Sequence, residues 1–190
     1  RARTAGDRSV THFYTPYVDN VAHEYGAESR QTFDAMRSVD RAIERMAKSL
    51  PSGTRVILTA DHGQLSGPVH EIWPTDPLVS YLEQEPWGDS REMHFAVRPS
   101  SIEQFEADFR ERFGDLAFLL TTGEVETLEL LGPGPIDDVT MKRLGTHLAI
   151  SRGPDSFKYR APTLRPHNKK FIGHHSGLTP DEMLIPLIIV

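Results

Sequence analysis

Apolar side chains recur at every third or fourth position between residues 29 and 50, and this periodicity predicts an amphipathic helix. Ser29 precedes the repeat and Pro51 follows it, as is typical of the two ends of a helix. We expect the stripe to face a protein core. It consists of Phe33, Met36, Val39, Ile43, Met46 and Leu50.

Two apolar runs flank this helix and indicate a strand–helix–strand unit. Residues 9–19 are rich in aromatic and β-branched side chains, which favours a strand that ends at Asp19. Residues 55–60, RVILTA, form a short and nearly continuous apolar run, the pattern of a strand buried on both faces of a parallel sheet. The fold class is therefore α/β.

Composition narrows the choice of partners. The 190 residues include 21 basic and 27 acidic side chains, a net charge of −6, so a nucleic-acid duplex is not an expected partner. No apolar run reaches the roughly 18 residues of a membrane helix. The chain contains no cysteine, so a transition metal would need carboxylate ligands or some of its nine histidines.

Because the sequence starts at Arg1 without a signal segment, we expect a fragment or a processed chain, and the compartment stays unknown.

The turn-rich texture of residues 64–170 indicates an inserted, smaller α+β region between a core segment at 1–63 and a returning segment at 171–190. Within the insertion we expect helices at 77–84 and 101–113, the second capped by Ser101, and strands at 93–98, 116–120 and 148–151. A strand at 183–190 would end the chain.

Two predicted strands end beside an acidic residue and a histidine, and these pairs are the main functional signal. Asp19 and His23 are four residues apart and would share one face of a helical turn. Asp61 and His62 are adjacent, and Gly63 leaves the backbone room to bend. Ligand sites of open α/β sheets lie at the carboxyl ends of strands. Oxygen and imidazole donors without sulfur suit hydrolytic zinc or manganese.

A third cluster lies on the loop 173–177, GHHSG, directly before the last apolar run. A loop that leads into a strand normally lies at the opposite edge of the sheet, so this loop would have to fold back to join the other donors. Five other histidines are not expected to bind metal. We expect His12 to be packed or to lie at a sheet edge. We expect surface or loop positions for the others, which are His70, His94, His147 and His167.

Three segments together resemble the type I phosphodiesterase/nucleotide pyrophosphatase family of the alkaline phosphatase superfamily. They are TPYVDNVAHEYG at 15–26, VILTADHG at 56–63 and GHHSGLTPDEMLIPLIIV at 173–190. The resemblance implies a doubly wound, mostly parallel sheet and a site for two divalent metal ions, usually zinc, with manganese as an alternative. By the same resemblance Asp19, His23 and His175 match the ligands of one metal, and Asp61 and His62 match ligands of the other.

The family pattern favours His175 over His174 as the ligand, and it commonly has glycine where this chain has Ser176. The implied activity is metal-dependent hydrolysis of a small phosphoester or nucleotide. The family's Thr or Ser nucleophile would lie upstream of this chain, in an N-terminal part of the same protein.

Several alternatives remain open at this stage. They are a non-catalytic metal- or phosphate-binding domain, a phosphomutase, a sulfatase and, more remotely, a serine hydrolase that uses Ser176 without a G-x-S-x-G motif. The insertion would select the leaving group. Its aromatic residues Trp73, Tyr81 and Trp87 could stack on a base, although a small core of their own is the preferred interpretation.

Overall fold

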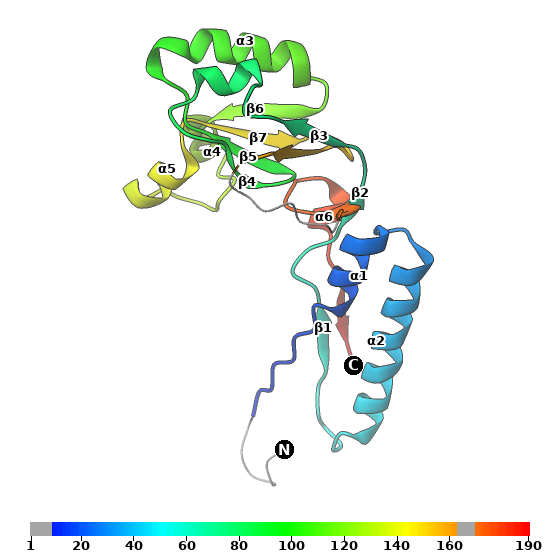
Figure 1. Ribbon diagram of the computed structural model, residues 1–190. Coiled ribbons are helices and arrows are strands. Elements are labelled where there is room, and N and C mark those ends of the chain that lie inside the picture. The colour runs from blue at the N-terminus through cyan, green and yellow to red at the C-terminus, as the bar shows by residue number, and fades with distance from the viewer. Residues whose placement is uncertain (1–8, 163–169) are drawn as a thin grey trace.

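The computed structural model describes residues 9–162 and 170–190, which form two lobes joined by a narrow middle section (Figure 1). The smaller lobe contains helices α1 (Tyr17–Tyr25) and α2 (Arg30–Ser49) and strands β1 (Ile57–Thr59) and β10 (Leu187–Ile189). The middle section contains β2 (Leu65–Ser66), β9 (Gly173–His174) and helix α6 (Pro180–Met183). The larger lobe contains the elements from β3 to β8.

The larger lobe is built on a four-stranded antiparallel sheet in the order β4-β5-β7-β6. These strands span Trp87–Asp89, Glu92–Phe95, His147–Ser151 and Ala117–Thr121, respectively. Beside the sheet, β3 (Val69–Ile72) pairs in parallel with β8 (Ser156–Tyr159). The remaining helical elements of this lobe are η1 (Pro77–Tyr81), η2 (Pro99–Ser101), α3 (Ile102–Phe113), α4 (Thr122–Thr127) and α5 (Asp138–Leu144).

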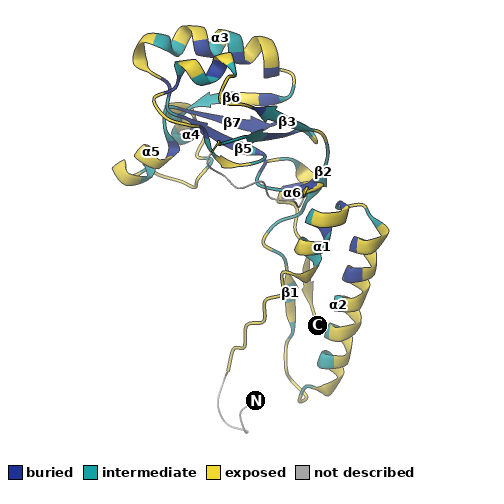
Figure 2. Ribbon diagram, viewed as in Figure 1, coloured by how far each residue is buried: buried dark blue, intermediate teal, exposed yellow. Residues whose placement is uncertain are grey.

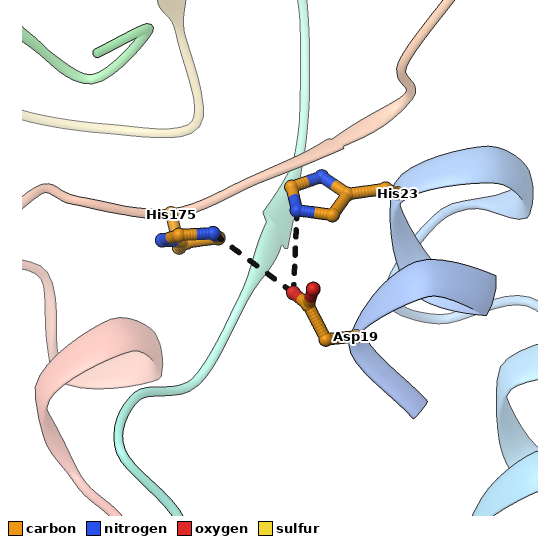
Figure 3. Close-up of side chains that lie close together, drawn as sticks. All are labelled: Asp19, His23 and His175. Carbon is orange, nitrogen blue, oxygen red and sulfur yellow. Dashed lines mark ion pairs between the residues drawn. The ribbon is translucent and has the colours of Figure 1, made fainter. Parts of the chain in front are cut away.

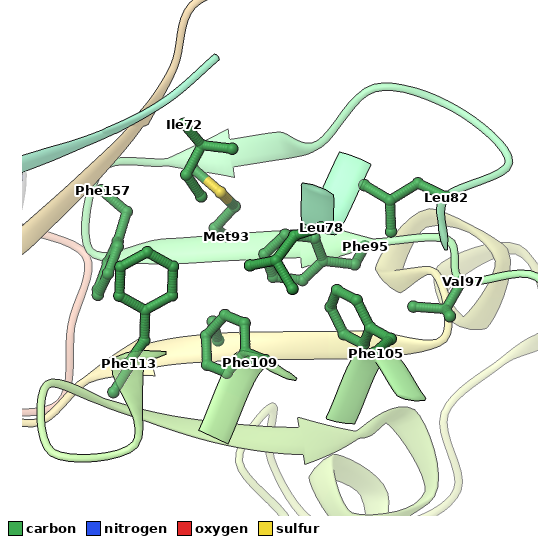
Figure 4. Packing of buried hydrophobic residues seen from close by; sticks show 12 residues of the cluster. Ile72, Leu78, Leu82, Met93, Phe95, Val97, Phe105, Phe109, Phe113 and Phe157 are labelled. Carbon is green, nitrogen blue, oxygen red and sulfur yellow. The ribbon is translucent and has the colours of Figure 1, made fainter. Parts of the chain in front are cut away.

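Helix α3 supplies much of the core of this lobe. Phe105, Phe109 and Phe113 recur every four residues, so they lie on one helical face and are buried against the sheet (Figure 4). Phe95 of β5 packs at 5.2 Å from Phe105, measured between ring centroids. Because this cluster is continuous, the larger lobe has a hydrophobic core of its own.

The smaller lobe is much more exposed than the larger one (Figure 2). Helices α1 and α2 pack through small residues, of which Ala22, Thr32 and Ala35 are buried. Strand β1 pairs antiparallel with β10, and Ile57 is nevertheless 61% exposed. In the described ranges, no helix combines the length and the apolar character needed to cross a membrane.

The α/β class is confirmed, and so is the helix between residues 29 and 50, where the Ser29 side chain accepts a hydrogen bond from the Thr32 amide. The strand expected at 9–19 is wrong, because residues 9–16 have no regular structure and Asp19 lies in helix α1. Aromatic content favoured a strand there, but Val18, Val21 and Tyr25 recur at helical spacing after Pro16.

Two expectations about burial in the smaller lobe are also wrong. Strand β1 is not buried on both faces of a parallel sheet, since its described partner is the antiparallel β10. The apolar stripe of α2 is not a core stripe throughout, because Phe33 and Met36 are exposed. In this chain the buried face of α2 is the one that contacts α1.

In the insertion, the expected helix at 101–113 and the strands near 93–98, 116–120 and 148–151 are present as α3, β5, β6 and β7. The helix expected at 77–84 is a shorter 3₁₀ helix, η1, and Ser101 precedes α3 without a capping side-chain hydrogen bond. The final strand is shorter than expected, because Met183 belongs to α6 and residues 184–186 have no regular structure.

The histidines outside the predicted ligand set also differ from expectation. His94 and His147 are buried: His94 Nδ1 donates to the Leu144 carbonyl at 3.0 Å, and His147 Nε2 lies 3.1 Å from Glu106. His70 Nε2 is 2.7 Å from Asp155, and His12 is exposed rather than packed. His167 lies outside the described residues.

The aromatic residues Trp73, Tyr81 and Trp87 were expected either to stack on a base or to form a small core. Tyr81 packs against the phenylalanine core, whereas Trp73 is largely exposed. Trp87 stacks on His94, with 5.6 Å between the ring centroids. The buried cluster therefore contains five phenylalanines and neither of the tryptophans.

Candidate metal centre

Helix α1 presents Asp19 and His23 on one face because they are four residues apart. His23 Nε2 lies 3.2 Å from Asp19 Oδ1. Asp19 Oδ1 is buried and accepts no hydrogen bond from the protein. Burying a carboxylate oxygen without a partner is costly, so this atom is suited to a cation.

His175 reaches the same place from the other end of the chain. The short pairing of β9 with β2 turns residues 173–177 back over α1, which meets the geometric demand noted from the sequence. Gly173 lies so close to this helix that a Cβ atom would be 2.4 Å from the Ala22 carbonyl oxygen. His175 Nε2 is thereby placed 3.9 Å from Asp19 Oδ1, facing it (Figure 3).

Asp19, His23 and His175 meet the geometric condition for a shared cation. One donor atom from each lies within 4.8 Å of the others, and among residues 9–162 and 170–190 they are the one such group of three. The distances are longer than metal–ligand bonds of about 2.0–2.2 Å, but a central ion would need only small movements of the three side chains.

Asp61 and His62 lie beside this group rather than within it. They follow β1 on a turn, with His62 Nε2 at 3.8 Å from Asp61 Oδ1. The His62 ring stacks on the His175 ring, with 3.7 Å between the centroids and an interplanar angle of 18°. The two predicted ligand sets are therefore neighbours, and the Asp61 side chain is mostly open to solvent.

Backbone carbonyls select the tautomer of two imidazoles. His23 Nδ1 lies 2.8 Å from the Gly173 oxygen, and His62 Nδ1 lies 2.7 Å from the Gly63 oxygen. A carbonyl oxygen only accepts, so in the neutral form of each ring we assign the proton to Nδ1 and the lone pair to Nε2. The Nε2 lone pair of His23 then faces the Asp19 carboxylate, an arrangement that a bound cation stabilises.

Burial lowers the pKa of His175, and the neighbouring His62 lowers it further, while Asp89 and Asp19 oppose these effects. A lowered pKa keeps the imidazole neutral, and the neutral ring is the form that binds metal. His174 is turned away: its Nδ1 lies 2.9 Å from Ser90 Oγ, and burial lowers its pKa too.

Sequence reasoning missed the buried groups that support the loop, chiefly Arg91 and Glu182. The T-x-x-E pattern of Thr179 and Glu182 is a capping-box signal and could have indicated that Glu182 binds backbone amides. Its partnership with Arg91 had no sequence signal, because 91 residues separate the two.

Solved structures of other proteins share the fold of this chain. The chain matches murine ectonucleotide pyrophosphatase/phosphodiesterase 5 with a TM-score of 0.64 and 14% identity, over 89% of this chain and 44% of that one. It matches phosphonoacetate hydrolase from Sinorhizobium meliloti 1021, in complex with phosphonoformate, with a TM-score of 0.61 and 16% identity, over 90% and 43%. The fold is therefore the alkaline phosphatase-like α/β fold of these hydrolases, and the chain spans less than half the length of either.

The family follows from the sequence itself. A profile of the family described as type I phosphodiesterase/nucleotide pyrophosphatase matches residues 1–124, well over half of the chain. This protein belongs to that family, as the three segments had indicated. No curated protein matches the chain.

Proposed function

We propose that this chain contributes metal ligands to a metal-dependent phosphoester hydrolase. The observation that carries the proposal is the buried Asp19 Oδ1, which accepts no hydrogen bond and is faced by Nε2 of His23 and of His175. Family membership supports a phosphodiesterase or pyrophosphatase type of chemistry.

The donors fit two divalent cations, with zinc first and manganese as the alternative. Asp19, His23 and His175 would hold one, and Asp61 and His62 would contribute to the second. Bound cations of this kind neutralise charge on phosphoryl oxygens and activate an oxygen nucleophile. The residues of this chain would orient two of these imidazoles, His23 and His62, through the carbonyls of Gly173 and Gly63.

We also propose that the Thr or Ser nucleophile lies on a segment outside these 190 residues. Both solved relatives are more than twice as long as the part that this chain matches. In the described part of the chain, β1 and β10 form a separate two-stranded sheet, and such pairs are marginally stable without cover. Their exposed apolar residues, together with Phe33 and Met36 of α2, offer a surface that a further α/β segment of the same protein would bury.

The proposed substrate is a small phosphoester or a nucleotide. An inactive variant of the murine relative is described in complex with AMP, which supports a nucleotide. The Sinorhizobium meliloti relative is a phosphonoacetate hydrolase, so a phosphonate is the second candidate. A panel of p-nitrophenyl phosphate, bis-p-nitrophenyl phosphate, p-nitrophenyl sulfate and phosphonoacetate, assayed on the complete protein, distinguishes ester, sulfate and phosphonate chemistry.

The metal site itself is tested by zinc titration of the chain against a chelator of known affinity. Asp19→Asn keeps the side-chain shape but removes the charge, and we expect the zinc affinity of this variant to fall at least about 100-fold. Substituting a residue that only hydrogen-bonds to a metal ligand typically lowers the affinity by roughly 10–100-fold. Asp40→Asn is the matched control, because Asp40 is acidic, exposed and outside the ligand set. Equal zinc affinity for wild type and Asp19→Asn would contradict the assignment.

A further inference from the structure

Glu182 is a buried carboxylate at the junction of the two lobes. It lies on α6 with 2% exposure, and the fully buried Arg91 is its ionic partner. Arg91 Nε and one terminal nitrogen donate to the two carboxylate oxygens at 2.5 and 2.8 Å, a bidentate arrangement.

Glu182 also contacts both ligand-bearing turns. Its carboxylate accepts the Gly177 amide at 2.8 Å, two residues beyond His175. Its backbone carbonyl accepts the Gly63 amide at 2.7 Å, one residue beyond His62. One residue therefore binds the backbone next to a predicted ligand of each metal.

The close packing around Glu182 leaves little freedom for these turns. A Cβ atom on Gly177 would lie 2.7 Å from Glu182 Oε2, and one on Gly63 would lie 1.9 Å from the Asp181 carbonyl oxygen. Both glycines are thus pressed against α6. The separation of the two turns is set by the position of this short helix.

The partner Arg91 comes from the insertion, on the turn between β4 and β5. Its terminal nitrogens also donate to the carbonyls of Asp155 at 2.9 Å and Gly153 at 2.8 Å, so the guanidinium is anchored in the larger lobe. The adjacent Ser90 hydroxyl lies 2.9 Å from His174 Nδ1. The insertion therefore contacts the histidine loop directly.

A buried ion pair is poor evidence of stability, because desolvation of the two charges offsets their attraction. Its better-supported use is to specify one arrangement. Burial would raise the pKa of Glu182, but hydrogen bonds from Arg91, Thr179 and Gly177 outweigh it, so the pKa is lowered and the carboxylate stays ionised.

We propose that Glu182, held by Arg91, is a positioning residue that fixes His62 and His175 at the separation required for paired metal binding. This inference rests on the proposed metal site. Under this inference the insertion also supports the metal site, because it supplies Arg91, which holds Glu182 in place.

The test uses the double variant Arg91→Met/Glu182→Met in the full chain. Replacing a buried pair with apolar side chains of similar size preserves folding in many proteins, whereas removing one partner leaves an uncompensated charge. Glu182→Asp is the second variant, because it keeps the charge but draws the carboxylate away from Gly177. The matched control is Asp76→Asn/Arg112→Met, which removes an ion pair of the insertion that does not contact the loop.

We measure zinc affinity by chelator competition and the visible spectrum of the Co²⁺-loaded chain, which reports ligand number and geometry. We expect zinc affinity to fall about tenfold or more in both Glu182 variants, with a Co²⁺ spectrum that approaches that of His175→Ala, and no change in the control. A purely structural role would lower stability but leave the Co²⁺ spectrum as in wild type. If the folded Glu182 variants bind zinc as tightly as wild type and have the wild-type Co²⁺ spectrum, the inference about Glu182 is overturned. The proposed metal site itself would not be contradicted by that result.

If the wild-type chain binds no zinc, the proposed function fails, and amide hydrogen exchange of residues 170–178 still decides the inference. Faster exchange of this loop in the Glu182 variants than in the control supports positioning by Glu182. Equal exchange in all variants overturns it. Circular dichroism of each variant shows whether it is folded. If the double variant does not fold, the same comparison is made with Glu182→Asp alone.

Discussion

Ser176 has backbone strain next to the predicted metal ligand His175. Its φ is +96°, a region that favours glycine, and its hydroxyl is buried without a hydrogen-bond partner. Positive φ costs a residue with a Cβ atom about 1–2 kcal/mol. The unpaired hydroxyl adds about 1 kcal/mol, the lower end of the usual range for a half-buried group.

We therefore expect Ser176→Gly to stabilise the chain. The greater flexibility of glycine in the unfolded state offsets about 0.5–1 kcal/mol, which leaves a net gain of about 1–2 kcal/mol. For a chain of this length the melting temperature should rise by about 2–8 °C, at roughly 2–4 °C per kcal/mol. Urea unfolding followed by circular dichroism measures the free energy of unfolding.

Two further variants separate strain from the hydroxyl. Ser176→Ala removes the hydroxyl but keeps the Cβ, so we expect a gain of no more than about 1 kcal/mol. Glu129 also has positive φ, at +51°, but is exposed, so Glu129→Gly should gain about 0.5–1 kcal/mol from strain alone. If Ser176→Gly proves less stable than wild type by more than 0.5 kcal/mol (roughly the smallest reliable difference), the reasoning from backbone strain is refuted.

Three more predictions concern the core, the second ligand pair and pH. Phe105→Ala should lower the free energy of unfolding by about 3–5 kcal/mol, because Phe105 is fully buried, and a loss below 1 kcal/mol (roughly the cost of a surface change) would contradict the core assignment. Asp61→Asn should weaken zinc binding in chelator competition far more than His12→Ala, and equal losses would exclude Asp61 as a ligand. The lowered pKa of Glu182 means that its ionisation contributes stability above its ordinary pKa of 4.5, lost as pH falls through the lower folded value. The stability of wild type relative to Arg91→Met/Glu182→Met, measured by urea unfolding at several pH values, should therefore fall as the pH falls, and a difference that does not change with pH would contradict this linkage.

Local patterns were sufficient to predict part of the fold. The period of residues 29–50 and the Ser29 cap predicted α2, and short apolar runs between turns predicted β5, β6 and β7 of the insertion but not β2, β3, β4 or β8. Helix α1 was missed because its nine residues follow an aromatic run that favours a strand. Burial was harder to predict, since the exposure of Met36 and Ile57 depends on which surfaces meet rather than on the residues themselves.

The donors of the candidate site could be proposed from their order in the sequence, whereas the means of bringing them together could not. The return of His175 to Asp19 depends on the pairing of β2 with β9 and on the Arg91–Glu182 contact. These contacts join segments about 90–110 residues apart, and a single sequence contains no local signal for them. Likewise, His94 contacts α5 and His147 contacts α3, and both of these contacts join residues more than 40 positions apart in the chain.

The pairing of β1 with β10 has a practical consequence for work on this chain. Within the residues that the structure describes, each of these strands has one hydrogen-bonded neighbour, so each leaves an edge whose amides and carbonyls are free to pair. Exposed apolar edges of this kind recruit strands from other molecules. Chain concentration and self-association should therefore be monitored in every binding experiment, because intermolecular strand addition at this sheet would compete with the folded monomer.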